Sequence, residues 1–263
     1  MTTRVMVLMY HALYADETER EAIDPVERPY AVSVEVFRRQ LDWMAAAGIP
    51  IRDPVSPSGA AAGAPVSIVL SFDDGHASNY WHAFPLLRDR GHAGVFFVTT
   101  DFIGTRRAFC EWPQLREMAG AGMHIGSHGR SHRFFDDLPT AGLEAEYSES
   151  RDAIEAGTGQ TPRLISFPGG RYLREQIPAG RAAGYQLFFT SDIGANAPRA
   201  FEPGGIVRRI AIGHTTSHEA FTRIAGADSL FLARSMAIGG VKKSLRRMIG
   251  NRLYHALYER FST

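Results

Sequence analysis

Short apolar runs separated by helix-like segments set the strongest limit on the fold of this chain. Three runs in the first half have the length of strands and end in polar residues: Val5 to Tyr10, Ser67 to Phe72 and Gly94 to Thr99. Helix-like segments lie between them, over Val34 to Ala47 and over Ser78 to Arg90. Strand and helix therefore alternate, which is typical of a parallel sheet covered by helices.

The same alternation continues through the second half. Helices are predicted over Trp112 to Ala119 and Ala141 to Ala156, and strands over His124 to Gly126, Leu164 to Phe167 and Leu187 to Thr190. A length of 263 residues is close to what a single α/β barrel uses. We therefore expect an α/β fold, a barrel of parallel strands and helices.

Composition excludes several classes of protein. Hydrophobic residues make up 44% and charged residues 22%, which is ordinary globular composition. Lys plus Arg number 29 and Asp plus Glu 28, so no chain-wide positive field would attract nucleic acid. The single cysteine, Cys110, cannot form an internal disulfide or a cysteine-based zinc site. The sequence lacks a signal-peptide cleavage site and a membrane-length apolar run, so we expect a cytoplasmic protein.

Two segments stand apart from the alternating pattern. The stretch Asp53 to Pro65 is rich in Pro, Gly, Ala and Ser, which predicts a surface loop. From Val241 onward, apolar residues recur at helical spacing with Lys and Arg between them, so residues 236–263 are predicted to be a basic amphipathic helix. Such a helix could lie against anionic lipid, which would make the protein membrane-associated, or it could dock on the barrel with its charged face solvated.

The first chemical motif is Ser71-Phe72-Asp73-Asp74-Gly75, directly after the apolar residues Ile68-Val69-Leu70. Two adjacent carboxylates at the end of a buried strand are costly to desolvate unless a positive charge compensates them, and a metal ion is one such charge. In a barrel, the carboxyl ends of the strands form the active face. The alternative is an Asp-Gly turn with both acids in solvent.

The second motif is a set of histidines spaced four residues apart, which suits two imidazoles on one metal. The chain has three such pairs: His124 with His128, His128 with His132, and His214 with His218. His128 and His132 follow a predicted strand and would complete a His, His, carboxylate set with Asp74. We expect His124 to be packed or to support a ligand, whereas His214 and His218 remain a rival pair without an obvious third ligand.

The third motif is a predicted strand, Ile165 to Phe167, that is interrupted by Pro168, Gly169 and Gly170. Glycines allow a substrate oxyanion to approach backbone N–H groups closely. The alternative is an ordinary turn.

In their order and spacing, the three motifs resemble the polysaccharide deacetylase family, also called the NodB-homology or carbohydrate esterase family 4 domain. The family's [ST]FDDG is matched by residues 71–75, its H[ST]xxxH by residues 128–132, and its aromatic-Pro-x-Gly by residues 167–170. The resemblance implies an irregular (β/α) barrel over residues 1–235 and a hydrolase that removes N-acetyl groups from an amino sugar of a polysaccharide or its precursor.

The resemblance also implies roles for individual residues. Asp74, His128 and His132 would bind one divalent metal, with zinc as the default and cobalt or nickel as alternatives. Asp73 would be the general base that activates the metal-bound water, and the backbone N–H of Gly169 would stabilise the oxyanion. Aromatic residues could form a wall for a sugar ring of the N-acetylated glycan, although such residues are often core: Phe102, Trp112, Tyr172 and Phe189.

The sequence departs from the family's commonest pattern in two places. Many members have an arginine before the third motif to hold the base, where this chain has Ser166 and Phe167. The substitutes left open are Arg171, Arg208 and Arg209.

The family's late Leu-x-His segment, whose histidine is the acid, also lacks a clear counterpart. His11 is the candidate acid and His214 the alternative. These departures keep two other hypotheses open: a deacylase of another amide or of an O-acetyl ester, and a glycan-binding module that has lost catalysis.

Overall fold

The computed structural model describes residues 3–55 and 64–237. Its main sheet has eight strands, and every pairing in it is parallel. The order along the sheet is β10-β1-β4-β5-β6-β7-β8-β9. The bounds are β1 Arg4–Tyr10, β4 Val66–Phe72, β5 Val95–Val98, β6 His124–Ser127, β7 Leu164–Ser166, β8 Leu187–Phe189, β9 Gly205–Val207 and β10 Ile210–Ala211. All six predicted strands are confirmed.

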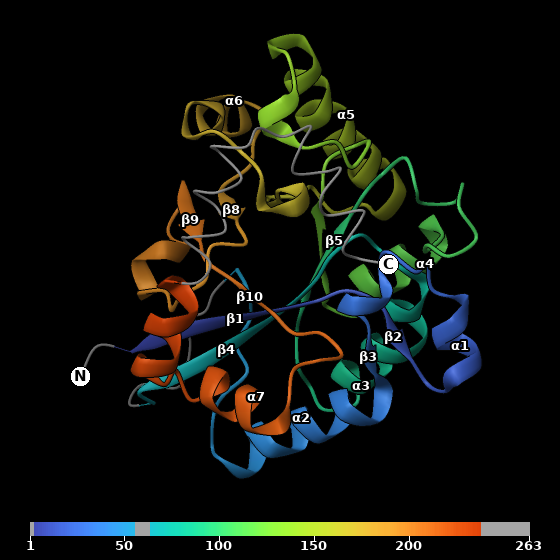
Figure 1. Cartoon of the computed structure of the whole chain (residues 1–263). Coiled ribbons are helices and arrows are strands. Elements are labelled where there is room, and N and C mark those ends of the chain that lie inside the picture. Colours follow the sequence, from blue (N-terminus) through green and yellow to red (C-terminus); the bar gives the residue numbers. More distant parts are fainter. Residues whose placement is uncertain (1–2, 56–63, 238–263) are drawn as a thin grey trace.

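Helices surround these strands (Figure 1). The α-helices are α1 Glu17–Ala22, α2 Val34–Ala46, α3 Phe84–Arg88, α4 Trp112–Gly120, α5 Thr140–Thr158, α6 Ile177–Ala182 and α7 His218–Ala225, and residues 229–237 are also helical. A small parallel pair, β2 (Leu13–Tyr14) with β3 (Val32–Ser33), lies near α1. Within the described ranges, no helix combines the length and apolarity needed to cross a bilayer. The predicted C-terminal helix lies outside the described residues from position 238 onward, and most of the predicted 53–65 loop does too.

The sheet must curl until its two edges almost meet. β9 is at one edge and β10 at the other, yet only Arg208 and Arg209 separate them in the chain. The three Cα–Cα steps from Val207 to Ile210 span at most about 10 Å of extended backbone. The predicted irregular (β/α) barrel is therefore confirmed, with a two-residue link across the gap between β9 and β10.

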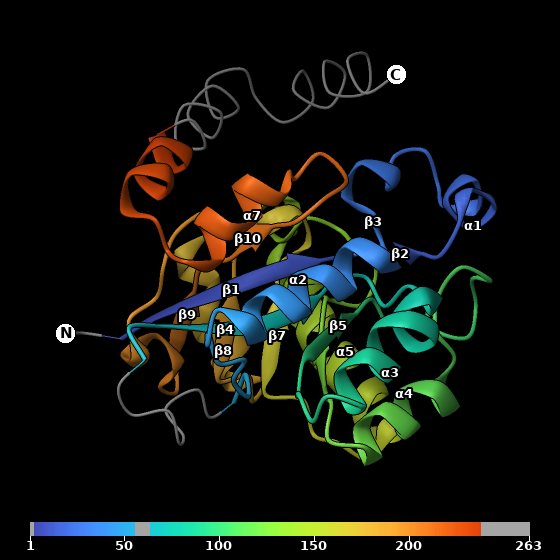
Figure 2. The same cartoon turned by 90° about the horizontal axis from the view of Figure 1, so that it is seen from below.

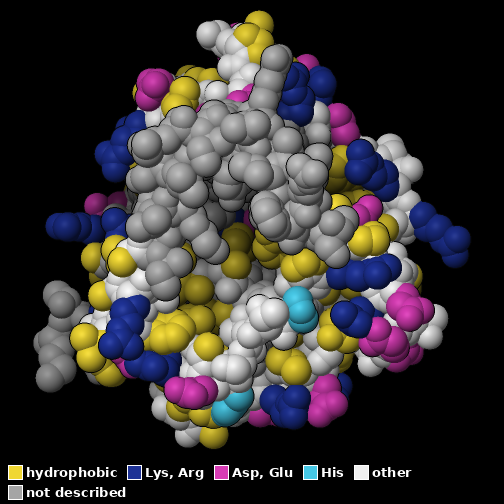
Figure 3. Space-filling model, viewed as in Figure 1, with side chains coloured by type: hydrophobic (Ala, Val, Ile, Leu, Met, Phe, Trp, Pro, Cys, Tyr) yellow, Lys and Arg dark blue, Asp and Glu magenta, His cyan; other side chains and the backbone are white. Residues whose placement is uncertain are grey.

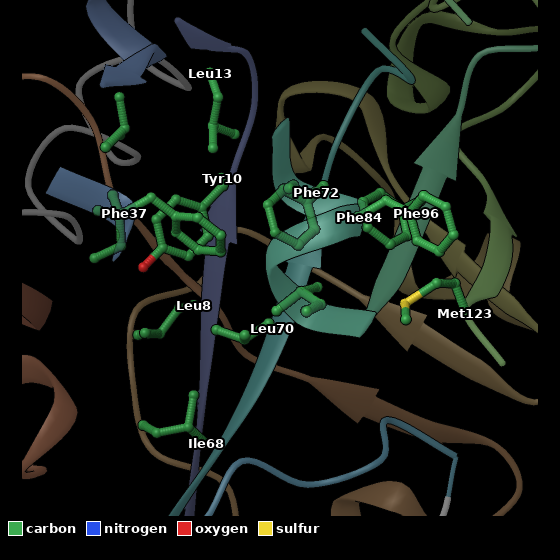
Figure 4. Packing of buried hydrophobic residues seen from close by; sticks show 14 of the residues in the cluster. Leu8, Tyr10, Leu13, Phe37, Ile68, Leu70, Phe72, Phe84, Phe96 and Met123 are labelled. Carbon is green, nitrogen blue, oxygen red and sulfur yellow. The ribbon is translucent and has the colours of Figure 1, made fainter. Parts of the chain in front are cut away.

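Side chains alternate between the inside of this barrel and its outside, as the pleat requires. Leu8, Leu70 and Phe96 point outward into a core shared with the helices, where Phe37 of α2 and Phe84 of α3 also lie (Figure 4). The neighbouring residues belong to a separate inner cluster, which contains Val7, Val69, Val95 and Phe97. Whether a site residue faces the barrel interior is therefore set by its position along its strand.

One predicted helix differs from expectation. Instead of a continuous helix over 78–90, the chain forms a π-helix, η2 (Asn79–Ala83), followed by the short helix α3. Pro85 lies at the start of α3. Proline has no N–H to donate and its ring crowds the carbonyl four residues earlier, so the regular α-helical ladder cannot run through this point.

Candidate active site

Three side chains from two strand ends converge at the carboxyl end of the sheet. Asp74 follows β4, and His128 and His132 follow β6. Asp74 Oδ1 lies 3.3 Å from His128 Nε2 and 3.2 Å from His132 Nε2, and the three possible ligand atoms all lie within 4.8 Å of one another. Among the described residues, this is the one group of three or more histidine, cysteine or acidic side chains arranged to hold a metal ion.

The environment of Asp74 fits a cation. Its Oδ1 atom is buried and accepts no hydrogen bond with good geometry from any described residue. Burial alone would raise the pKa of Asp74, but the side chains of His128 and His132 hold it well below its usual value. Asp74 also adopts a left-handed backbone, with φ of 73°. A non-glycine residue pays strain for this conformation, which is common where a functional side chain must be aimed.

The loop that carries the two histidines is held from behind. His128 Nδ1 donates to the carbonyl of Ser166 at 2.9 Å, which leaves Nε2 free to face Asp74. Glu146, a buried acid on α5, accepts hydrogen bonds from the backbone N–H groups of Arg130 and Ser131, at 2.5 and 3.0 Å. Residues 128–132 form no helix, so the four-residue spacing works here through a turn anchored by Glu146.

Asp73 forms a bidentate ion pair with a buried arginine. Arg209 Nη1 donates to Asp73 Oδ1 at 2.6 Å and Nη2 donates to Oδ2 at 2.7 Å. The guanidinium also donates to the Thr190 carbonyl at 3.0 Å and to the Ser166 hydroxyl at 2.6 Å, and its side chain has no exposed surface. Ser166 in turn donates to Asp73 Oδ2 at 3.2 Å. Ser166 therefore links the acid, its arginine and, through its carbonyl, His128.

This arrangement keeps Asp73 ionised. Burial alone would raise the pKa of Asp73, but Arg209 and then His128 bring it below its usual value. Asp73 Oδ2 lies 3.9 Å from His128 Nε2, beside the possible metal position and outside the converging trio. Of the three arginines left open by the sequence, Arg209 holds Asp73. Arg171 pairs with Asp136 at 2.9 Å, and Arg208 is exposed.

The two candidate acids lie in different surroundings. His11 follows β1, and its Nδ1 is buried with no hydrogen-bond partner among the described residues. Burial lowers the pKa of His11, although the charges of Asp74 and Asp73 oppose that shift, so the ring shares their electrostatic environment. His214 is exposed and its Nδ1 lies 3.1 Å from the carbonyl of Pro29.

The remaining predicted residues are placed as follows. Gly169 is exposed, three residues beyond Ser166, in the left-handed region with φ of 59°. Tyr172 is half-buried and stacks on Phe167 with ring centroids 4.5 Å apart. Phe102 and Phe189 are buried in the core. Figure 3 shows hydrophobic side chains in the middle of one face of the molecule and charged ones around them, with a histidine exposed beside the apolar area.

The histidines left over are not part of this group. His124 is the first residue of β6, at the opposite end of the strand, where its Nε2 lies 2.9 Å from Asp53 Oδ2. His214 and His218 are both exposed, and the described residues place no acid with them in a metal-binding group.

Comparison with known proteins identifies the central segment. The family model described as polysaccharide deacetylase matches residues 61–188. Residues 61–188 belong to the polysaccharide deacetylase family. The protein YxkH of Bacillus subtilis (strain 168), whose name describes it as a candidate polysaccharide deacetylase, is 32% identical over 128 residues, which are 49% of this chain and 46% of YxkH. The matched region therefore spans about half of the curated relative. It contains Asp73, Asp74, His128 and His132, whereas His11 and Arg209 lie outside it.

Solved structures share the fold over a longer stretch. The Streptococcus pyogenes deacetylase PplD, in complex with acetate, superposes with a TM-score of 0.72 at 23% identity, over 86% of this chain and 99% of that one. IcaB from Ammonifex degensii gives a TM-score of 0.68 at 23% identity, over 85% of this chain and 96% of that one. The likeness in fold to these solved structures thus extends well beyond residues 61–188.

Glu146 is the supporting residue that the sequence reasoning missed. It sits on the buried face of α5, with Leu143, Tyr147, Ser150 and Ile154. A charged residue at helical spacing among buried positions is a signal that it has a specific partner, because an unpaired buried carboxylate is costly.

Proposed function

We propose that this protein is a metal-dependent hydrolase that removes N-acetyl groups from an amino sugar of a polysaccharide or of its precursor. The observation that carries the proposal is the convergence of Asp74, His128 and His132 within 4.8 Å, beside a second carboxylate that is fixed outside the trio. Membership of residues 61–188 in the polysaccharide deacetylase family supports the choice of reaction.

The donor set suits a divalent transition metal. Two imidazoles and one carboxylate are ligands that zinc accepts, and three protein ligands leave room for water and substrate. Zinc is therefore the first candidate, and cobalt or nickel could occupy the same nitrogen and oxygen ligands. A divalent ion held there would supply a Lewis acid that polarises the acetyl carbonyl and lowers the pKa of the attacking water.

The roles of the chain's own residues follow from their positions. Asp73 is ionised and oriented by Arg209, so it can accept a proton from the attacking water as that oxygen bonds to the acetyl carbon. The backbone N–H of Gly169 would donate to the oxygen that becomes negatively charged. The charges of Asp74 and Asp73 favour the protonated form of His11, and in that form His11 would give a proton to the departing amine when the C–N bond breaks. Asp73 would then release the proton that it took from the water. The products are acetate and a free amino sugar.

The arginine contact weakens the case for a binding module without catalysis. That hypothesis began from the missing arginine before the third motif. Arg209 reaches the same acid from the link between β9 and β10, and Asp73 is held on both oxygens. The base is therefore oriented as general base catalysis requires.

Metal content and acetate release test the proposal together. The purified protein is stripped with a chelator, reloaded with Zn²⁺, Co²⁺ or Ni²⁺, and assayed on N-acetylglucosamine oligomers. We expect Asp74→Ala and His132→Ala to lose both metal and activity, whereas His218→Ala, a matched exposed histidine outside the trio, keeps both. Full metal content and full acetate release in Asp74→Ala would refute the proposed site.

The nature of the acyl substrate needs a second comparison. Acetylated xylan and a simple linear acetamide are assayed beside the N-acetylglucosamine oligomers under the same metal loading. Preference for the oligomers supports the amino-sugar substrate. Preference for xylan would identify an O-acetyl esterase, and preference for the linear acetamide a small-amide deacylase.

A further inference from the structure

A cavity with a volume of about 560 Å³ lies against the loop that follows Asp74. It is formed between α1, β2, the segment 76–78, η2 and the segment 107–108. Its lining residues are Leu13, Glu19, Ala22, Ile23, His76, Ala77, Ser78, Trp81, His82, Arg107 and Ala108. The size is within the range of small-ligand sites, roughly 300 to 1,000 Å³.

An exposed indole stands on the wall of this cavity. Trp81 has 63% of its surface exposed, more than any other aromatic residue that the structure describes as exposed. Its ring meets the Tyr80 ring edge-on, with centroids 4.8 Å apart, so the indole has a packed neighbour on one side. An indole face is electron-rich and attracts the polarised C–H groups on the flat side of a pyranose ring.

Polar groups accompany the indole. Glu19 Oε2 lies 2.8 Å from His82 Nε2 and also accepts from the backbone N–H of Ala15, at 2.6 Å. Arg107 is exposed and forms no hydrogen bond or ion pair with any residue that the structure describes. The cavity therefore combines an apolar platform with a fixed carboxylate–imidazole pair and a free guanidinium, which are groups that hydrogen-bond to sugar hydroxyls.

One loop joins the cavity to the candidate active site. His76 is two residues beyond Asp74, and the segment after Asp74 is tied to the opposite wall by backbone hydrogen bonds from Cys110 to Gly75 and from Ala77 to Ala108. In Figure 2, β1 and β4 run side by side towards the end of the molecule where α1, β2 and β3 lie. The segment 76–78 of the cavity wall therefore begins two residues beyond Asp74, on the same loop as the proposed metal ligand.

We propose that this cavity binds a pyranose ring of the glycan chain that flanks the sugar to be deacetylated, with Trp81 as its stacking platform. The inference rests on the proposed function, because it makes the cavity an extension of that active site. It implies that the protein acts best on oligomers long enough to occupy both sites.

Binding is measured first, by calorimetry, with the full-length protein in chelator so that bound sugar is not hydrolysed. The probes are the dimer and the pentamer of N-acetylglucosamine. We expect the pentamer to bind more tightly than the dimer, and Trp81→Ala to weaken pentamer binding by about tenfold while changing dimer binding by less than about twofold.

A cavity-filling variant gives a second, independent perturbation. Ala22→Trp places a large side chain in the cavity and should also weaken pentamer binding. Glu21→Trp is the matched control, because residue 21 is the neighbour of Ala22 on α1 and does not line the cavity. Arg107→Ala is compared with Arg116→Ala, an exposed arginine on α4 outside the cavity. Thermal unfolding checks that each variant is folded.

Kinetics then separates this inference from the proposed function. In the metal-loaded protein, kcat/KM for acetate release from the pentamer should fall in Trp81→Ala and Ala22→Trp, whereas the value for the dimer should not. Equal binding of the pentamer by the wild type and both variants would overturn the inference, even in an active deacetylase. If the wild type releases no acetate at all, the proposed function fails, and the binding comparison alone then decides whether the cavity holds a sugar.

Discussion

Replacement of Arg209 by methionine should destabilise the metal-free protein in a strongly pH-dependent way. The substitution removes both hydrogen bonds to Asp73 and leaves a buried carboxylate without its cation. Breaking a buried pair by removing one partner typically costs 3–5 kcal/mol, so we expect a loss of about 4 kcal/mol in the free energy of unfolding at neutral pH.

The pH dependence arises because the buried Asp73 can take up a proton and so lose its unpaired charge. Without Arg209, burial raises the pKa of Asp73, and the folded protein takes up a proton that the unfolded chain, with a pKa of 3.8, does not hold at neutral pH. The free energy needed to protonate Asp73 rises by about 1.4 kcal/mol for each pH unit above its unfolded-state pKa. It is therefore at most about 4 kcal/mol at pH 7, which lies roughly three units above that pKa, and less than half of that at pH 5. The destabilisation should therefore shrink by about 2–3 kcal/mol between pH 7 and pH 5.

Urea unfolding of the chelator-treated protein at both pH values measures the effect. Arg208→Met is the matched control, since Arg208 is the adjacent exposed residue, and its stability should change little. The double variant Asp73→Asn/Arg209→Met should lose the pH dependence and be more stable at pH 7 than the sum of the single losses predicts. A penalty below about 1 kcal/mol, or one that is equal at pH 5 and pH 7, would refute the reasoning.

Three further predictions concern groups near the site or in the core. Glu146→Gln should weaken metal binding by about tenfold in a chelator competition titration, because it loosens the histidine loop, whereas the exposed Glu144→Gln should not; equal affinities would contradict this role. Burial raises the pKa of Cys110 to about 12, so iodoacetamide should modify it only when the protein unfolds, and rapid labelling of the native protein would contradict the burial. Burial, and then the charge of Asp74, raises the pKa of Glu27 from 4.5 to about 7. The folded metal-free protein therefore binds a proton that the unfolded chain does not, and its stability should fall as the pH rises from about 4.5 to 7. Glu27→Gln should reduce this pH dependence of the free energy of unfolding in urea, and an unchanged pH dependence would contradict the shift.

The parts of this molecule that the sequence predicted are those set by local pattern. The six strands and three of the helices, α2, α4 and α5, follow from apolar periodicity. The acids and histidines directly follow strands, so a parallel sheet brings them to one edge. What local pattern did not predict depends on closure of the sheet. β9 and β10 have three and two residues, too short for a periodic signal, and the anchoring contact of Glu146 depends on how α5 packs behind the histidine loop.

The sequence also could not decide which of the three candidate arginines holds Asp73, because that contact depends on closure of the sheet. Arg209 and Asp73 are 136 positions apart, and their contact exists only because the two edges of the sheet are joined by two residues. Along such a short extended link, successive side chains point to opposite sides, so one arginine faces solvent and the other faces the barrel interior, where Asp73 also points. Ser166 of β7 completes the arrangement. Its small side chain leaves room for the Arg209 guanidinium beside Asp73, and its hydroxyl accepts a hydrogen bond from Arg209 and donates one to Asp73. The absence of an arginine before the third motif and the presence of Arg209 on the β9–β10 link therefore belong together. The short side chain of Ser166 on β7 leaves the space that the long side chain of Arg209 fills from the other side of the barrel.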